Sequence, residues 1–183
     1  MNDQLFKLYA LFDSLYEDIL PYCVNCKDHD CKGFVWLLKK EADLLFEKNT
    51  PILEINDGIF FIHSFEEIDG EILINKPKPP CVLKKENLCS LYKNRPLVCR
   101  MYPVGFAVVN DEISIVLHSD CNFSRCMSKA EKNVFFQKVI EILRRIPANF
   151  FDEIVTNYAN VCRISTFPDG INDVEVITPI RLI

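Results

Sequence analysis

The sequence is poor in glycine and has no long hydrophobic run. Only five of its 183 residues are Gly, which leaves little room for the Gly-rich loops that bind dinucleotides or S-adenosylmethionine. Its longest uninterrupted apolar run is about five residues, at 34–38, whereas a helix needs roughly 20 to cross a bilayer. The first residues, Met1 to Gln4, lack the basic segment of a signal peptide. We therefore expect a cytoplasmic protein that does not enter the membrane.

An excess of basic residues is also missing. Lys and Arg number 21 against 26 Asp and Glu, a net charge of −5. Because a free-standing nucleic-acid-binding domain usually has a basic face, we expect no nucleic-acid partner, and a protein partner or substrate stays unidentified. The length and the 49% hydrophobic content are typical of one globular domain, so we expect a single domain over residues 1–183.

Cysteine, by contrast, is abundant, with nine residues at short spacings. In a reducing compartment, closely spaced cysteines indicate metal ligation more than disulfides. A Cys-x2-Cys pair lets two thiolates reach one cation, which suits Zn²⁺ or an iron–sulfur cluster. Cys162 stands alone, and we interpret it as a small buried residue in a strand-like segment. The candidate ligands are the other eight, Cys23-x2-Cys26-x4-Cys31, Cys81-x7-Cys89-x9-Cys99 and Cys121-x4-Cys126.

The residues around these cysteines leave several alternatives open. His29 lies between Cys26 and Cys31 and could complete a zinc site of three sulfurs and one nitrogen, although a loop histidine needs no such role. Redox-active thiols are a third possibility, but the Cys-x2-Cys does not follow a strand and open a helix as in thioredoxin-like proteins. Thiolate-bound metal centres are anionic and need cations nearby, and Lys32, Arg95, Arg100 and Arg125 are close to cysteines in sequence.

Hydrophobic spacing predicts a small, irregular α+β fold with helices around short β-hairpins, and the cysteine spacing adds a cysteine-rich metal centre to this expectation. An apolar stripe at three- and four-residue steps predicts a helix over residues 3–20 that Pro21 ends, and residues 23–33 then form a polar loop. Ser128 and Glu131 make a capping box that opens another helix. Further helices are predicted at 34–48 and 150–158, hairpins at 52–62, 69–74 and 106–117, and an edge strand in the tail, 174–183.

The segment from Cys81 to Pro103 is the most specific motif. It resembles the second motif of the YkgJ-type cysteine-cluster proteins, a family described as zinc- or iron-chelating. The first motif of that family, a Cys-x2-Cys, a Cys-Cys pair and a helix bearing a Glu, is similar to Cys23, Cys26 and Cys31 with Glu41. The matching positions of the second motif are Cys81, Cys89, Tyr92, Arg95, Pro96, Cys99, Arg100, Tyr102 and Pro103.

The resemblance covers roughly residues 20–130 and has departures. The Cys-Cys pair is replaced by Cys31-Lys32, and the extra Cys126 could substitute for the missing ligand. A looser similarity to flagellin lysine-N-methylases, which are associated with an iron–sulfur cluster, implies a four-iron cluster in preference to zinc. The expected function is therefore metal binding through clustered thiolates. The alternatives are an enzyme of the protein-lysine methyl-transfer type and a non-catalytic, zinc-stapled interaction module.

Independently of the resemblance, Pro96 is suited to begin a short helical turn. Such a turn would place Cys99 one turn further on, with Arg95 and Arg100 flanking it. At least one of these arginines can then face either the sulfurs or a carboxylate. For the metal-binding interpretation to hold, the cysteines of residues 23–31 must converge with Cys81, Cys89 and Cys99.

Overall fold

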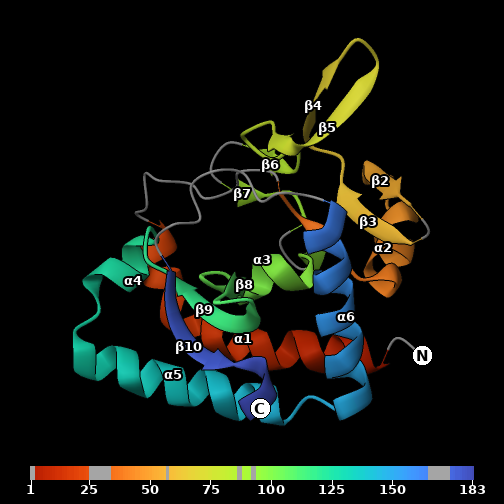
Figure 1. The fold of residues 1–183 in the computed structure, drawn as a ribbon. Coiled ribbons are helices and arrows are strands. Elements are labelled where there is room, and N and C mark those ends of the chain that lie inside the picture. The colour runs from red at the N-terminus through yellow and green to blue at the C-terminus, as the bar shows by residue number, and fades with distance from the viewer. Residues whose placement is uncertain (1–2, 25–33, 57, 86–87, 92–93, 165–173) are drawn as a thin grey trace. The chain divides into compact units, whose positions relative to one another are not determined.

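The computed structural model describes residues 3–24, 34–56, 58–85, 88–91, 94–164 and 174–183 (Figure 1). The fold is α+β, as predicted, and all paired strands in these ranges are antiparallel. The helices are α1 (Asp3–Val24), α2 (Lys39–Phe46), α3 (Leu97–Met101), α4 (Asn122–Cys126), α5 (Lys129–Arg144), α6 (Ala148–Ile164) and the 3-10 helix η2 (Ile180–Leu182). The strands are β1 (Trp36–Leu37), β2 (Ile52–Ile55), β3 (Ile59–Ile62), β4 (Phe65–Ile68), β5 (Glu71–Pro77), β6 (Lys84–Lys85), β7 (Leu88–Cys89), β8 (Val104–Val109), β9 (Glu112–His118) and β10 (Val174–Pro179).

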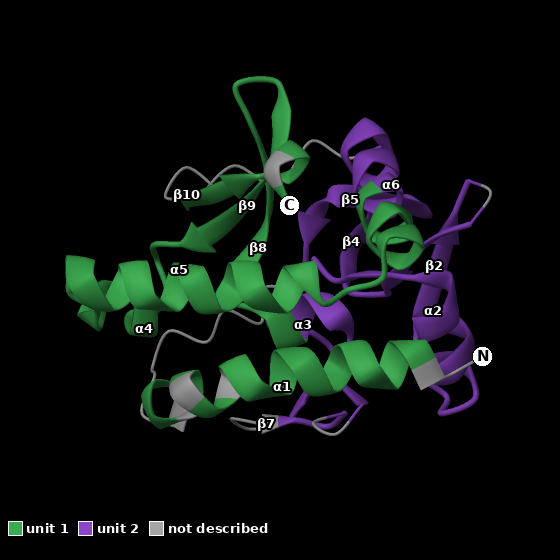
Figure 2. Cartoon of the chain, turned by 90° about the horizontal axis from the view of Figure 1, so that it is seen from below, with its two compact units in different colours: residues 1–28, 100–155, 170–183 green, residues 29–99, 156–169 purple. Residues whose placement is uncertain are grey.

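The chain divides into two compact units (Figure 2). Unit 1 consists of residues 1–28, 100–155 and 170–183, and unit 2 of residues 29–99 and 156–169. Two of the four boundaries fall inside described elements, one inside α3 after Cys99 and one inside α6 after Val155. A single domain over the whole chain stays a prediction. None of the helices in the described ranges is long and apolar enough to span a bilayer.

Unit 1 combines helices α1, α4 and α5 with a three-stranded sheet of order β10-β9-β8. The predicted stripe of α1 is buried, and the helix packs against α4 and α5. Strands β8 and β9 form the predicted hairpin, whose turn residues Asn110 and Asp111 have φ of 52° and 62°. These residue types tolerate positive φ in tight hairpin turns. The tail prediction is confirmed for Val174–Pro179, because β10 is an edge strand, whereas Ile180–Leu182 form η2.

Unit 2 contains a three-stranded sheet of order β1-β3-β2, against which α2 packs. The predicted hairpin is present as β2 and β3, with Asn56 and Gly58 at positive φ in its turn. The core of the unit is here called the unit 2 cluster. Its buried members are Val35, Leu37, Ala42, Leu45, Ile62, Cys81 and Leu83, and Ile52, Phe60, Cys89, Leu91, Val98 and Cys99 pack against them.

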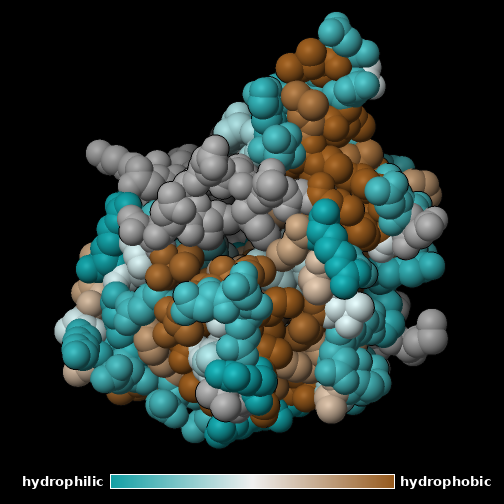
Figure 3. Space-filling model, in the orientation of Figure 1, coloured by the Kyte–Doolittle hydropathy of each residue, from teal (hydrophilic) through white to brown (hydrophobic). Residues whose placement is uncertain are grey.

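Strands β4 and β5 form a two-stranded ribbon in unit 2, at the turn that Asp69 and Gly70 predict. Hydrophobic side chains follow this ribbon on the face drawn in Figure 3. Ile68 is 50% exposed at its end, and residues 72–74 are half-buried. A ribbon with only two strands buries little of its apolar surface, so part of that surface stays in water.

Two helix predictions are wrong at their ends. The helix expected over 34–48 is only α2, since Trp36 and Leu37 instead form β1 and pair with Phe61 and Phe60 of β3. Pairing with a distant strand outweighs the helical preference of this short apolar segment. The helix expected over 150–158 extends over Ala148–Ile164, because its apolar spacing continues past Tyr158.

Pro21 does not end α1, which continues to Val24. A proline inside a helix removes one backbone hydrogen bond and is costly, but only one turn of α1 follows it. The ring of Tyr22 meets Phe123 of α4 edge-on at 5.2 Å between centroids, and this contact within unit 1 holds the last turn. Cys23 therefore belongs to the helix and not to the predicted polar loop.

Candidate metal centre

Three of the predicted ligands, Cys81, Cys89 and Cys99, belong to the unit 2 cluster. Cys81 is 7% exposed, and the other two are half-buried. They lie eight and ten residues apart in sequence, and the fold of unit 2 brings all three to one cluster. The apolar surroundings lower the local dielectric, which strengthens any bond between a thiolate and a cation.

A tight turn and a small hairpin position Cys81 and Cys89. The carbonyl of Cys81 accepts a hydrogen bond from the Lys84 N–H at 2.9 Å. Strands β6 and β7 then pair Lys84 with Cys89, and the Ser90 N–H donates to the Leu83 carbonyl at 2.8 Å. The chain thus turns after Cys81 and returns at Cys89, which brings both into the cluster around Leu83.

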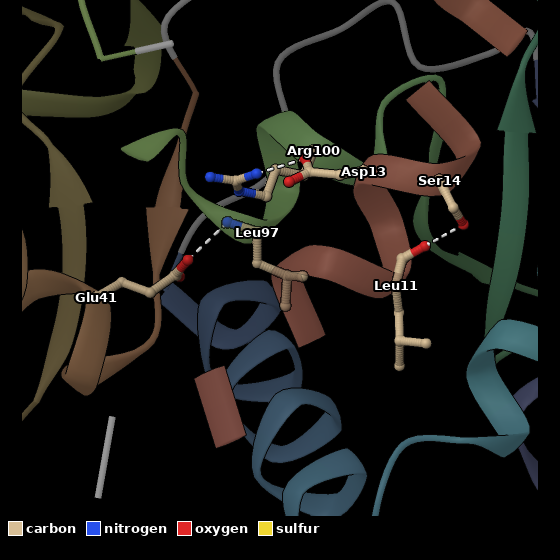
Figure 4. Close-up of polar contacts among 6 residues, drawn as sticks. All are labelled: Leu11, Asp13, Ser14, Glu41, Leu97 and Arg100. Atoms are coloured by element: carbon tan, nitrogen blue, oxygen red, sulfur yellow. Dashed lines mark hydrogen bonds and ion pairs between the residues drawn. The ribbon is translucent and has the colours of Figure 1, made fainter. Parts of the chain in front are cut away.

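Cys99 lies on α3, which starts after Pro96 as predicted. The Cys99 N–H donates to the Pro96 carbonyl at 3.0 Å, so the two residues are one turn apart. The first amide of the helix, the Leu97 N–H, donates to Oε1 of Glu41 at 2.6 Å (Figure 4). Oε2 of Glu41 accepts the Leu38 N–H at 2.9 Å, and the side chain is completely buried. One carboxylate therefore caps both α2 and α3 within unit 2.

Arg100 follows Cys99 but points to a carboxylate. In unit 1 its guanidinium forms an ion pair with Asp13 of α1 (Figure 4) and lies over the Tyr9 ring at 4.1 Å from the centroid. Arg100 is 3% exposed, whereas the Asp13 side chain is 50% exposed. This confirms that one of the two flanking arginines faces a carboxylate.

The other described candidates lie at the two ends of α4 in unit 1. Cys121 is buried and is the N-cap of the helix, whereas Cys126 is its last residue and exposed. The Cys126 thiol is 3.8 Å from Oδ1 of Asn122. Two residues five positions apart in a helix do not share a face, so α4 does not turn these two thiols toward one point.

Cys162 lies in α6, and its expected strand-like setting is therefore wrong. It stands one turn after Tyr158, with which it shares a hydrogen bond in unit 2. Burial raises the pKa of the Cys162 thiol, and the hydrogen bond to Tyr158 opposes this shift in part. Cys162 thus has an intrahelical partner, which agrees with its interpretation as a packed residue and not a ligand.

The remaining candidates fall outside what the structure describes. Cys26 and Cys31 lie outside the described residues, as does His29, and of Cys23 only the helical backbone is described. Tyr92 and Lys32 are outside as well. The predicted convergence of these cysteines with Cys81, Cys89 and Cys99 therefore stays a prediction.

Among the described side chains, no three of His, Cys, Asp or Glu form a group that could hold a metal ion. The cysteine thiolates are the type of ligand that the predicted metal requires, because structural zinc sites and iron–sulfur clusters both use them. Three of them share one apolar cluster, with Cys99 on a helix whose first amide is held by a buried carboxylate. No family model, curated protein or solved structure matches the chain.

Two contacts of this region were not predicted from the sequence. Glu41 is part of the resemblance, but its bond to an amide 56 residues away is not visible in the motif. Asp13 lies 87 residues from Arg100, and no local pattern marks it. The one available indication is Arg100, a charge within the otherwise apolar helix α3, where it needs a partner.

Proposed function

We propose that the protein binds a metal centre through clustered cysteine thiolates, with an iron–sulfur cluster favoured over zinc. The observation that carries this proposal is the common placement of Cys81, Cys89 and Cys99 in the unit 2 cluster. The resemblance of residues 81–103 to the cysteine-cluster family supports metal binding, and the looser similarity to flagellin lysine-N-methylases favours iron. We further propose a cytoplasmic location, where reducing conditions keep thiols available for metal.

The full ligand set is drawn from the cysteines at 23, 26, 31, 81, 89, 99, 121 and 126. Cys81, Cys89 and Cys99, which lie in unit 2, are the core of this proposed set. A bound zinc ion would supply a structural cross-link, and a bound iron–sulfur cluster would add electron transfer. The chain itself holds the thiolates in an apolar setting and fixes the turn that carries Cys99.

The test is the metal content of anaerobically purified protein, with iron, sulfide and zinc measured together. An iron–sulfur cluster gives a brown protein with absorption near ~400 nm and equal iron and sulfide. Stoichiometric zinc in a colourless protein supports the zinc form of the proposal. A folded, metal-free protein with no uptake on reconstitution would contradict both forms.

Serine variants then identify the ligands. Replacing Cys89 or Cys99 removes a thiolate of the unit 2 cluster, so metal content falls. Cys162→Ser is the matched control, because Cys162 is also half-buried in unit 2 but is hydrogen-bonded to Tyr158. Equal metal loss in all three variants would show that the effect is general destabilisation and would remove Cys89 and Cys99 from the ligand set.

A further inference from the structure

Glu41 is the only described acidic residue that is fully buried, with an exposed fraction of 0%. Burying a carboxylate is expensive unless hydrogen bonds replace its lost water. Both oxygens of Glu41 accept backbone amides, Leu38 N–H at 2.9 Å and Leu97 N–H at 2.6 Å. Hydrogen bonds to an ionised acceptor are stronger than neutral ones, so this carboxylate joins two distant segments of unit 2 firmly.

The bond to Leu97 acts on the turn that carries Cys99. Pro96 has no N–H, so the Leu97 N–H is the first donor of this turn, and it ends on Glu41. The Leu97 side chain is itself completely buried. The start of α3 is thus held by its backbone and by its side chain. Cys99 comes two residues later, and the orientation of the turn sets the direction of its sulfur.

Glu41 lies on α2, a helix whose buried apolar residues are part of the unit 2 cluster. Ala42 and Leu45 of α2 are buried members of this cluster, and Val98 and Cys99 of α3 pack against it. Glu41 precedes Ala42 in sequence, and its carboxylate links the first turn of α2 to the first turn of α3. Rotation of α3 relative to α2 would break the Leu97 bond and leave the charge partly unsatisfied.

We propose that Glu41 is a positioning residue for the Cys99 thiolate. It fixes the turn at 96–99 so that the sulfur is held in a ligating orientation before metal arrives. The part of this inference that concerns metal retention rests on the proposed function, whereas the orientation of Cys99 can be tested in the metal-free protein.

The decisive variant is Glu41→Gln, which keeps the size of the side chain. A Gln has one carbonyl oxygen and one NH2 group, so it can accept only one of the two amides and presents a donor to the other. Glu41→Asp keeps the charge but is one methylene shorter and cannot bridge both donors. Ser64→Ala is the matched control in unit 2. It removes a buried hydroxyl that donates to the Lys78 carbonyl at 3.2 Å, away from α3.

The first measurement is the alkylation rate of individual thiols in metal-free protein, followed by mass spectrometry. Glu41→Gln is expected to change the rate at Cys99 several-fold and to leave Cys162 unchanged, and Ser64→Ala is expected to change neither. Equal changes at both thiols, or no change at Cys99, would overturn the proposal. This measurement tests the orientation of Cys99 even if the protein proves to bind no metal.

The second measurement is metal release to a chelator. Loss of a group that orients a ligand weakens metal binding by about 10- to 100-fold, so release from Glu41→Gln should be faster by that order and release from Ser64→Ala unchanged. Equal release from wild type and Glu41→Gln would refute the positioning role while leaving the metal centre intact. If both Glu41 variants fail to fold, the test is the hydrogen-exchange rate of the Leu97 amide in wild-type protein. A protected amide supports its bond to Glu41, and an amide that exchanges freely contradicts the proposal.

Discussion

Individual thiols in this chain have different surroundings, and their chemistry should differ accordingly. Cys162 is half-buried and hydrogen-bonded to Tyr158, and burial raises its pKa. Burial and the neighbouring Cys162 also raise the pKa of Tyr158. Cys126, at the end of α4, is exposed. Since the thiolate is the reactive form, a raised pKa and restricted access both make a thiol inert.

In folded, metal-free protein, iodoacetamide at pH 8 should therefore modify Cys126 well before Cys162. The measurement is the rate at each site by peptide mass spectrometry in native protein, with denatured protein as the reference in which both sites react alike. Replacing Tyr158 by Phe removes the hydrogen bond that lowers the Cys162 pKa, so Cys162 should react more slowly still. Faster labelling of Cys162 than Cys126 in the native protein would contradict the buried helical setting.

The capping box of α5 is a second feature of single residues, and it is confirmed. The Glu131 N–H donates to the Ser128 hydroxyl at 3.3 Å, and the Ser128 N–H donates to the Glu131 carboxylate at 2.7 Å. Hydrogen bonding of the Glu131 carboxyl group with the Ser128 side chain, and then with the Ser128 backbone N–H, lowers the pKa of Glu131. The stabilisation by this carboxylate is therefore present above its ordinary pKa and is lost as the pH falls through the lowered value.

Ser128→Ala should return the Glu131 pKa toward its ordinary value, as followed by NMR titration of the carboxyl carbon. Loss of the serine cap should also destabilise unit 1 by about 1 kcal/mol in urea. Ser14→Ala is the control, because Ser14 is an exposed helical serine that is not a cap and donates only to the Leu11 carbonyl (Figure 4). An unchanged Glu131 titration would show that the box does not persist in solution.

Elements are held in this protein by a few polar contacts between segments far apart in sequence. In unit 1, Arg100 joins α3 to α1 through Asp13 and the Tyr9 ring.

In the same unit, β8 and β9 approach closely at Gly105, where an added Cβ would lie 2.8 Å from Nε2 of His118. That imidazole stacks on Tyr102 at 5.6 Å between ring centroids, so it cannot move away without losing this contact.

Asp13→Asn should lower the stability of the protein by about 1–2 kcal/mol. A buried guanidinium that loses its charged partner would cost more, but Asp13 is half exposed and water replaces part of the interaction. The measurement is urea unfolding. Glu17→Gln, an exposed neutralisation on the same helix, should change stability by much less. Equal effects of the two variants would show that the Arg100–Asp13 pair is not a specific contact.

Gly105→Ala should destabilise the β8–β9 hairpin, because the new methyl group displaces the His118 ring. Forcing an extra methyl into a packed site typically costs about 1–3 kcal/mol. His118→Ala removes the obstacle, so the double variant should recover part of the loss caused by Gly105→Ala. Additive losses in thermal unfolding would mean that the two residues do not meet.

Elements with strong local patterns could be predicted, and those fixed by distant contacts could not. The stripe of α1, the hairpin turns at residues 56–58, 69–70 and 110–111, and the Ser128 capping box all show local patterns. Strand β1 could not be predicted, because it depends on pairing between Trp36 and Phe61. The continuation of α1 past Pro21 depends on the Tyr22–Phe123 contact, which local sequence does not contain.

For the molecule as a whole, the sequence predicts the α+β class and the turn that carries Cys99, both of which the structure confirms. The burial of Glu41 and its bond to Leu97 could not be predicted, since they depend on packing α2 and α3 on one cluster. The alternation of the chain between two units, with boundaries inside α3 and α6, was likewise not predicted. Local patterns do not encode which segments share a unit.

The proposed metal centre consists of metal–sulfur bonds, and X-ray absorption at the metal edge measures these bonds directly. Anaerobically purified protein should show sulfur as the dominant neighbour of the bound metal, at about 2.3 Å if the metal is zinc. The sulfur signal should fall in Cys99→Ser and persist in Cys162→Ser. A first shell of nitrogen and oxygen only, or protein that holds no metal, would contradict the proposed thiolate centre.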